Sequence, residues 1–191
     1  MATIDKYIPI VLRWEASTAM KSSESLEAAF ERAKKKGFAN DPSDPGGATM
    51  IGVTLSTYKT YCKRNGMKTP TVNDLKNIKY KIWRDILHTM YWGKWKADTI
   101  EDQNVANMLV DWVWMSGANI GIKRPQKLLG VTQDGIVGPK TIAAVNNTQG
   151  FLKVLYDARK SHFENIVKSR PASAKFLKGW MNRLNYLYGK L

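Results

Sequence analysis

One stretch of the sequence, Gly37–Thr54, combines acidic and hydroxyl side chains with the residues that shape tight turns. It contains two carboxylates, Asp41 and Asp44, and the hydroxyl of Thr49, among prolines and paired glycines. Paired acids on a shaped surface suit acid–base or hydrolytic chemistry. Asp side chains in turns, however, commonly bond their own backbone. Turn chemistry alone explains these residues, so the loop by itself favours the structural interpretation.

The segments around this loop have the apolar periodicity of α-helices, and only Met50–Thr54 has the pattern of a short strand. Ser25–Lys36 is well delimited, because acidic residues open it, three lysines close it and a glycine follows. We therefore predict a mainly α fold with at most a short β element near the loop. The expected helices are Tyr7–Trp14, Ser25–Lys36, Leu55–Arg64, Thr71–Thr89, Gln103–Ser116, Pro125–Leu129, Phe151–Ser169 and Ala172–Tyr188, with one more beginning at Pro139.

The charge balance is strongly basic. The 191 residues include 30 Lys and Arg against 16 Asp and Glu, a formal net charge of +14 with histidine neutral. An excess of this size indicates a polyanionic partner, such as nucleic acid, an acidic membrane surface or an anionic wall polymer. No nucleic-acid partner is expected, because the basic residues are spread along the chain and no nucleic-acid-binding motif occurs.

Few residues are suited to metal or disulfide chemistry. Cys62 is the single cysteine, which excludes an internal disulfide framework, and His88 and His162 show no metal-ligand spacing. No cofactor or metal is therefore expected, and both histidines are expected on helix surfaces. The N-terminus lacks the pattern of a signal peptide, and no apolar run is long enough for membrane insertion. We expect synthesis in the cytoplasm, and action at the cell wall only if another component releases the protein.

Three blocks of the sequence resemble glycoside hydrolase family 108, bacterial and phage N-acetylmuramidases also labelled secretion activators. The family motif reads E-G-G-Y-x-N-D-P-x-D-x-G-G-x-T-x-x-G-I-T. Nearly every position from Gly37 onward fits it, with Phe38 in place of Tyr and Val53 in place of Ile. A second block, Leu128–Thr141, resembles the family's peptidoglycan-binding segment. Further similar positions are Tyr91-Trp92, Arg159 and Gly179-Trp180-x-x-Arg183.

The resemblance implies a lysozyme-like helical fold. Residues 1–117 would form the catalytic part, and residues 118–191 a helical, peptidoglycan-binding-like part packed against it. It also implies a catalytic glutamate just before the two glycines of the motif. Without gaps, this position falls on Lys35, which is no acid for a glycosidic oxygen at neutral pH.

With an insertion over residues 17–36, the glutamate position falls on Glu15 instead. Glu15 ends an apolar helix, as the glutamate of the family does. We prefer this alignment, because a loop insertion of such length costs little closure entropy. The inserted helix is expected to be external, with few large apolar residues, so that its deletion leaves a folded protein.

Glycosidic cleavage explains why these residue types are needed. A carboxylic acid protonates the leaving oxygen, and negative charge or a held water acts on the other face of the oxocarbenium-like centre. Desolvation beside Trp14 would keep Glu15 protonated, Asp44 would stay ionised on its polar loop, and the hydroxyl of Thr49 would hold the water. The alternative for Glu15 is a solvated carboxylate at a helix end. Inversion, retention and an anhydro-ring product all stay open.

The candidate substrate contacts include aromatic residues and two acids. Aromatic rings stack on pyranose faces, although large aromatics are more often core residues. A carboxylate in the apolar segment 108–112 must be hydrogen-bonded or lie at a cleft wall, so a structural role stays open for it. The candidates are Asp41, Tyr91, Trp92, Asp111 and Trp114.

With the resemblance, these residues predict a peptidoglycan hydrolase, an N-acetylmuramidase that cleaves the MurNAc–GlcNAc bond by general acid catalysis. The expected partners are peptidoglycan glycan strands, and the positive net charge fits an anionic wall. The alternative is a non-catalytic cell-wall-binding or secretion-associated protein. In that case Lys35 marks a lost site, and Asp134–Thr141 is kept for binding.

Overall fold

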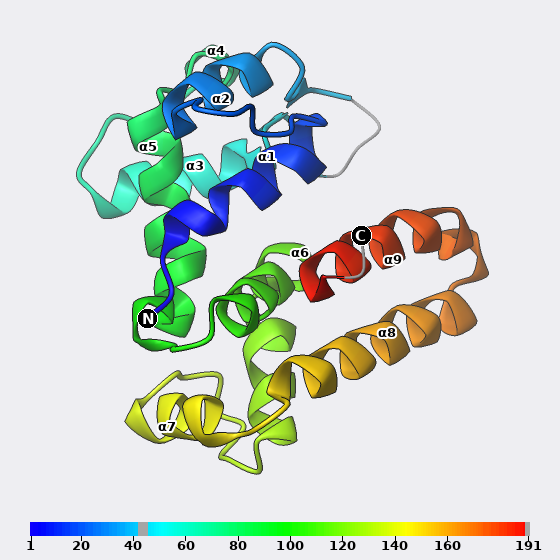
Figure 1. The fold of residues 1–191 in the computed structure, drawn as a ribbon. Helices are drawn as coiled ribbons and strands as arrows, with labels where there is room; N and C mark the ends of the chain where they lie inside the picture. Colours follow the sequence, from blue (N-terminus) through cyan, green and yellow to red (C-terminus); the bar gives the residue numbers. More distant parts are fainter. Residues whose placement is uncertain (42–45, 190–191) are drawn as a thin grey trace. The chain divides into compact units, whose positions relative to one another are not determined.

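A computed structural model describes residues 1–41 and 46–189, which fold mainly into α-helices (Figure 1). The prediction of a mainly α protein with a small β element is confirmed. The chain forms two compact units, one of residues 4–90 and one of residues 1–3 together with residue 91 onward. The division after residue 117 stays a prediction. Among the described residues, none of the helices has both the length and the apolar character that a bilayer span requires.

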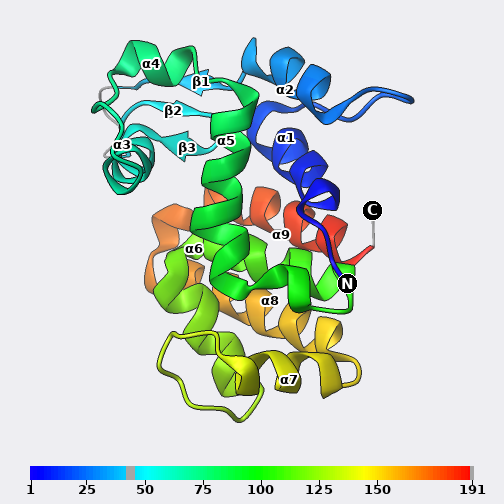
Figure 2. The same ribbon diagram turned by 90° about the vertical axis from the view of Figure 1, so that its left-hand side faces the viewer.

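The first unit combines helices with a small antiparallel sheet, which Figure 2 shows beside α3 and α4. Three two-residue strands pair in the order β1-β2-β3, with Phe38 opposite Met50 and Met50 opposite Val53. The elements are a 3-10 turn (Ile4–Lys6), α1 (Ile8–Ala16), α2 (Leu26–Lys34), β1 (Phe38–Ala39), β2 (Thr49–Met50), β3 (Val53–Thr54), α3 (Leu55–Arg64), α4 (Val72–Lys76) and α5 (Tyr80–Leu87).

The segment Met50–Thr54, expected as one strand, is a tight hairpin. Ile51 and Gly52 turn the chain with positive φ angles of 46° and 73°, the conformation that two-residue turns between twisted strands require. Ile51 is fully buried, and its carbonyl oxygen accepts a hydrogen bond from Nε1 of Trp83 at 3.2 Å. This contact fixes the hairpin, and with it the end of the motif loop, to the core of the unit.

The helix α2 starts where the sequence predicts, because the hydroxyl oxygen of Ser25 caps it by accepting a hydrogen bond from the N–H of Ala28 at 3.1 Å. The expectation of a purely external helix is wrong. Phe30 is fully buried, and its ring lies 5.1 Å from that of Trp83 and 5.5 Å from that of Tyr80. Deleting the inserted segment would leave a large cavity beside Trp83, so α2 belongs to the core.

Residues Thr71–Thr89, expected as one helix, form α4 and α5, and a π-helical turn (His88–Trp92) follows. A capping box opens α4, in which Thr71 and Asp74 exchange hydrogen bonds between side chains and backbone. Asn77 ends it, with its side chain bonded back to the helix. Because Asn side chains compete for backbone groups, they favour helix ends over helix interiors.

The second unit is built around α6, which breaks at Gly117, where φ is 76° and ψ is 162°. After this break the chain folds back so closely that a Cβ on Gly121 would lie 2.6 Å from the backbone of Val113, so only glycine fits there. Nε1 of Trp95 donates to the carbonyl of Gly121 at 3.2 Å. The elements are two 3-10 turns (Gly93–Trp95 and Ala97–Thr99), α6 (Gln103–Leu128), α7 (Pro139–Asn147), α8 (Phe151–Ser169), a third turn (Pro171–Ser173) and α9 (Ala174–Tyr188).

Candidate active site

Glu15 lies in the last turn of α1, the first α-helix of the first unit. Its side chain is half-buried, and the following Ala16 is buried. The helix ends at Ser17, which takes a left-handed conformation with φ of 47°, and the N–H of Thr18 then donates to the carbonyl of Leu12 at 3.1 Å. This C-terminal turn fixes where the Glu15 side chain leaves the helix.

The two ends of the inserted segment 17–36 lie next to each other. A Cβ on Gly37 would lie 3.4 Å from Cβ of Ala16 and 2.5 Å from Cγ1 of Ile51. The carbonyl of Gly37 also accepts a hydrogen bond from the N–H of Ile51 at 2.8 Å. The chain therefore leaves at Ala16, forms α2 and returns to the same place. If residues 17–36 are left out, the order Glu15-Ala16-Gly37 matches the glutamate and the two glycine positions of the family motif.

The described part of the motif loop contributes Asp41 and Thr49 to the same unit. Asp41 is exposed just after β1, and Thr49 is half-buried in β2. Thr49 pairs with Ala39 and with Thr54, so these three residues share one face of the sheet. Asp44 lies outside the described residues, and the prediction that it faces Glu15 stays a prediction.

Lys35, the position that the ungapped alignment gives, lies at the exposed C-terminal cap of α2. It lines a hollow of about 490 Å³ whose wall includes Phe38 and Met50. These two residues occupy the sheet face opposite to that of Thr49, because neighbouring strand residues point to opposite sides. The geometry therefore separates Lys35 from the Thr49 face, and Glu15 stays a prediction for the glutamate position.

In the second unit, Asp111 is fully buried between two arginines. One carboxylate oxygen accepts from Nη2 of Arg159 at 2.8 Å, and the other accepts from Nε and Nη2 of Arg183 at 2.9 and 2.7 Å. Burial alone would raise the pKa of Asp111, but the two guanidinium groups outweigh it and hold the pKa below its ordinary value. Asp111 is the hydrogen-bonded carboxylate that its apolar segment required, and no part of it faces solvent.

The aromatic candidates differ in accessibility. Tyr91 and Trp114 are half-buried neighbours, with ring centroids 4.6 Å apart at 60°. Trp92 is fully buried, and its Nε1 donates to the Asp98 carboxylate at 2.8 Å. Tyr91 and Trp114 therefore stay candidates for contacts with sugar rings, whereas Trp92 and Asp111 stabilise the fold.

The expectation that His162 lies on a helix surface is wrong. Its side chain packs inside the second unit, 7% exposed, with its ring 6.3 Å from that of Trp112. Burial lowers the pKa of His162 to about 4, and the positive charges of Arg124 and Arg159 add to this effect. The imidazole is therefore neutral at pH 7.

This burial predicts a pH-dependent stability. The unfolded chain protonates His162 near its ordinary pKa of 6.5, whereas the folded chain does so only near 4. Protonation of His162 therefore does not reduce the free energy of unfolding above pH 6.5, and it reduces that free energy as the pH falls from 6.5 to 4. In thermal melts over this range, His162→Gln should flatten the decrease, and His88→Gln should keep the wild-type slope. Parallel curves for wild type and His162→Gln would contradict the assignment.

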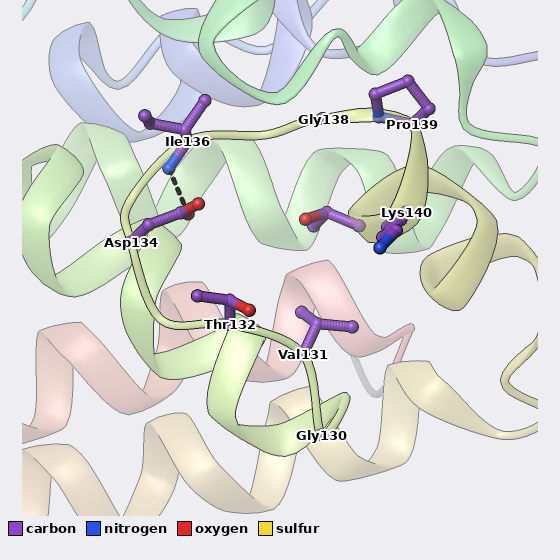
Figure 3. A pocket seen from close by; sticks show the side chains of 9 residues that line it. Gly130, Val131, Thr132, Asp134, Ile136, Gly138, Pro139 and Lys140 are labelled. Atoms are coloured by element: carbon purple, nitrogen blue, oxygen red, sulfur yellow. Dashed lines mark hydrogen bonds between the residues drawn. The ribbon is translucent and has the colours of Figure 1, made fainter.

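A second candidate site is the loop between α6 and α7, which encloses a hollow of about 650 Å³ (Figure 3). Val131, Thr132 and Asp134 approach it from one side, and Pro139 and Lys140 from the other (Figure 3). The Asp134 carboxylate accepts a hydrogen bond from the N–H of Ile136 at 2.8 Å, drawn as the dashed line. These residues belong to the block that resembles a peptidoglycan-binding segment, which makes the hollow a candidate binding site.

Gln126, which the sequence did not indicate, holds this loop in shape. Its side-chain amide donates to the Asp134 carboxylate at 2.8 Å and to the carbonyl of Ile136 at 3.0 Å, and its oxygen accepts from the N–H of Gly135 at 2.9 Å. Gln126 is fully buried. Its sequence neighbours Arg124 and Lys127 are charged, so nothing in the sequence distinguishes Gln126 from an ordinary surface residue.

Over residues 1–41 and 46–189, no group of three or more His, Cys, Asp or Glu side chains is arranged to hold a metal ion.

Comparisons with known proteins identify both parts of the chain. Residues 31–117 match the family model described as "Glycosyl hydrolase 108", and residues 120–185 match the one described as "Predicted Peptidoglycan domain". Among solved structures, the chain is similar to SagA of Brucella abortus, with 30% identity and a TM-score of 0.66 over 84% of this chain and 92% of that one. No curated protein matches the chain.

The two family matches identify a glycoside hydrolase that carries a peptidoglycan-binding-type segment. The chain belongs to glycosyl hydrolase family 108.

Proposed function

We propose that this member of the family is an N-acetylmuramidase that cleaves the MurNAc–GlcNAc bond of peptidoglycan, with Glu15 as the general acid. The supporting observation is the proximity of Ala16 to Gly37. Because Glu15 directly precedes Ala16, this proximity supports the alignment of Glu15 with the glutamate of the family motif. The family-model match begins at residue 31, so the support for Glu15 comes from the path of the chain and not from that match.

In the proposed mechanism, the proton donor lies at a helix end, and the residues that support the charge or hold the water lie on the loop. Glu15 gives its proton to the glycosidic oxygen as the bond breaks. Asp44, ionised on the polar loop, supports the positive charge that develops on the sugar or orients a water, and the Thr49 hydroxyl helps to hold that water. Tyr91 and Trp114 are the accessible aromatics for sugar stacking.

Purified peptidoglycan tests this proposal directly. After incubation with the protein, the soluble fragments should carry new reducing ends on MurNAc, identified by borohydride reduction and mass spectrometry. New reducing ends on GlcNAc would contradict the muramidase assignment. Binding to peptidoglycan without any fragments, on several wall types, would favour the non-catalytic wall-binding alternative.

The proposed wall recruitment predicts a salt dependence. With a net charge of +14, association with an anionic wall should weaken as ionic strength rises, because exposed charges are screened beyond about 10 Å at 0.1 M salt. Co-sedimentation with insoluble peptidoglycan between about 0.05 and 0.5 M NaCl measures this effect. Salt-independent binding would instead assign the affinity to apolar and aromatic contacts.

A further inference from the structure

A second cavity in the peptidoglycan-binding-type segment differs in character from the hollow of the loop. It has a volume of about 550 Å³ and is lined by Trp112, Arg124, Lys127, Leu128, Gln133 and Ala158. Its walls come from both halves of α6, from α8 and from the loop after α6. Gln133 lines this cavity, whereas its neighbours Thr132 and Asp134 line the other one. The same loop therefore separates the two cavities.

The charges around this cavity are positive and uncompensated. Arg124 and Lys127 are three residues apart, so they lie on one side of α6, and both are exposed. Neither forms an ion pair with another described residue of the chain. His162, close to Trp112 and neutral at pH 7, adds no charge of its own. Two cations at the mouth of a cavity favour an anionic ligand.

Trp112, one of the lining residues, carries a hydrogen-bond donor that has no partner among the described residues. Trp112 is fully buried, and its indole N–H has no acceptor among residues 1–41 and 46–189. Buried donors are normally paired, since leaving one unpaired destabilises the fold. The indole N–H is closed to solvent, so it reports on the occupancy of the neighbouring cavity without touching the ligand.

The remaining lining residues favour a small amphipathic ligand. Leu128 and Ala158 offer apolar surface, and Gln133 offers an amide that both donates and accepts hydrogen bonds. A carboxylate beside a methyl group fits this set, and it is the chemistry of the alanine residues that end peptidoglycan peptide stems. All the lining residues except Trp112 lie within the match to the predicted peptidoglycan domain.

We propose that this cavity binds the terminal carboxylate of a peptidoglycan peptide stem, with Arg124 and Lys127 as its charge partners. This inference extends the proposed function, because it specifies the part of the wall polymer that the second unit recognises. The glycan strand itself would then bind at the other candidate sites.

The Trp112 indole gives a specific readout. In the ¹⁵N-labelled full-length protein, acetyl-D-alanyl-D-alanine should shift the Trp112 Nε1–H resonance in a saturable way, because the ring lies beside the cavity, and the peptide's C-terminal amide should not. The Trp112→Phe spectrum assigns this resonance among those of the 7 tryptophans. Absence of the shift, or an equal shift with the amide, would overturn the proposal. A response to glycerol phosphate as strong as that to the dipeptide would also overturn it, in favour of a phosphate site.

Variants at the mouth of the cavity complete the test. Arg124→Gln and Lys127→Gln should each weaken dipeptide binding by about ten-fold, the usual scale for losing one charge-assisted hydrogen bond. Lys178→Gln, an equal charge change on the exposed side of α9, should leave it unaltered. Binding that is insensitive to Arg124→Gln and Lys127→Gln would refute the assignment.

The two proposals fail separately in this design. The dipeptide contains no glycosidic bond, so its binding does not depend on hydrolysis, and Glu15→Gln should bind it as the wild type does. Dipeptide binding by a protein that releases no muropeptides would keep the cavity assignment and reject the muramidase.

Discussion

Replacing Glu15 by glutamine should reduce peptidoglycan hydrolysis by roughly a hundred-fold or more, the usual effect of losing a general acid. The substitution keeps the shape and hydrogen-bonding capacity of the side chain but removes the proton that the leaving oxygen needs. Binding to the insoluble wall should change little, because that proton matters mainly in the transition state. Turbidity loss of a wall suspension gives the rate, and co-sedimentation gives the binding.

Two variants of the inserted segment serve as controls for this prediction. Lys35→Ala removes the residue that the ungapped alignment puts at the catalytic position, and Glu31→Gln makes the same chemical change on an exposed carboxylate of α2. Both should retain wild-type rates. If Glu15→Gln stays active, another carboxylate delivers the proton, and Asp44 is the next to replace. If Lys35→Ala loses activity at wild-type stability, the ungapped alignment is revived.

Elements whose ends are set by local interactions were predictable from the sequence. Leu55–Arg64 and Phe151–Ser169 have the bounds that their periodicity predicts, and α7 begins at Pro139, where proline is favoured. The break between α4 and α5 covers only residues 77–79, where Asn77 ends one helix and the extended Lys79 precedes the next, in a segment whose apolar spacing continues across it.

Features that depend on residues far apart in the sequence were not predictable in the same way. The carboxylate of Asp111 finds its partners 48 and 72 residues away, and only the fold shows that these arginines, at positions matching the family, surround it. The sequence predicts a surface position for His162, because helical periodicity does not show which face of a helix another helix covers. The resemblance to the family motif predicts Glu15, and the folded chain adds the proximity of Ala16 to Gly37.

The buried ion-pair cluster predicts the largest change in stability. Asp111→Ala should lower the free energy of unfolding by about 3–5 kcal/mol, because it leaves Arg159 and Arg183 buried without a counter-charge. Guanidinium titration monitored by circular dichroism measures this loss. The matched control is Asp157→Ala, which breaks the exposed pair with Lys153 and should cost at most about 1 kcal/mol.

A triple variant separates the net contribution of the cluster to the free energy of unfolding from the destabilisation caused by leaving the arginines unpaired. Asp111→Leu, Arg159→Met and Arg183→Leu together replace all three charged side chains with apolar side chains of comparable bulk. Because a buried ion pair gains in attraction about what it loses in desolvation, this protein should be more stable than Asp111→Ala alone. If the triple variant is instead the less stable of the two, the arginines support the fold through their own contacts, such as the one between Arg159 and the carbonyl of Met108 at 3.3 Å, and the charge of Asp111 is not what stabilises this core.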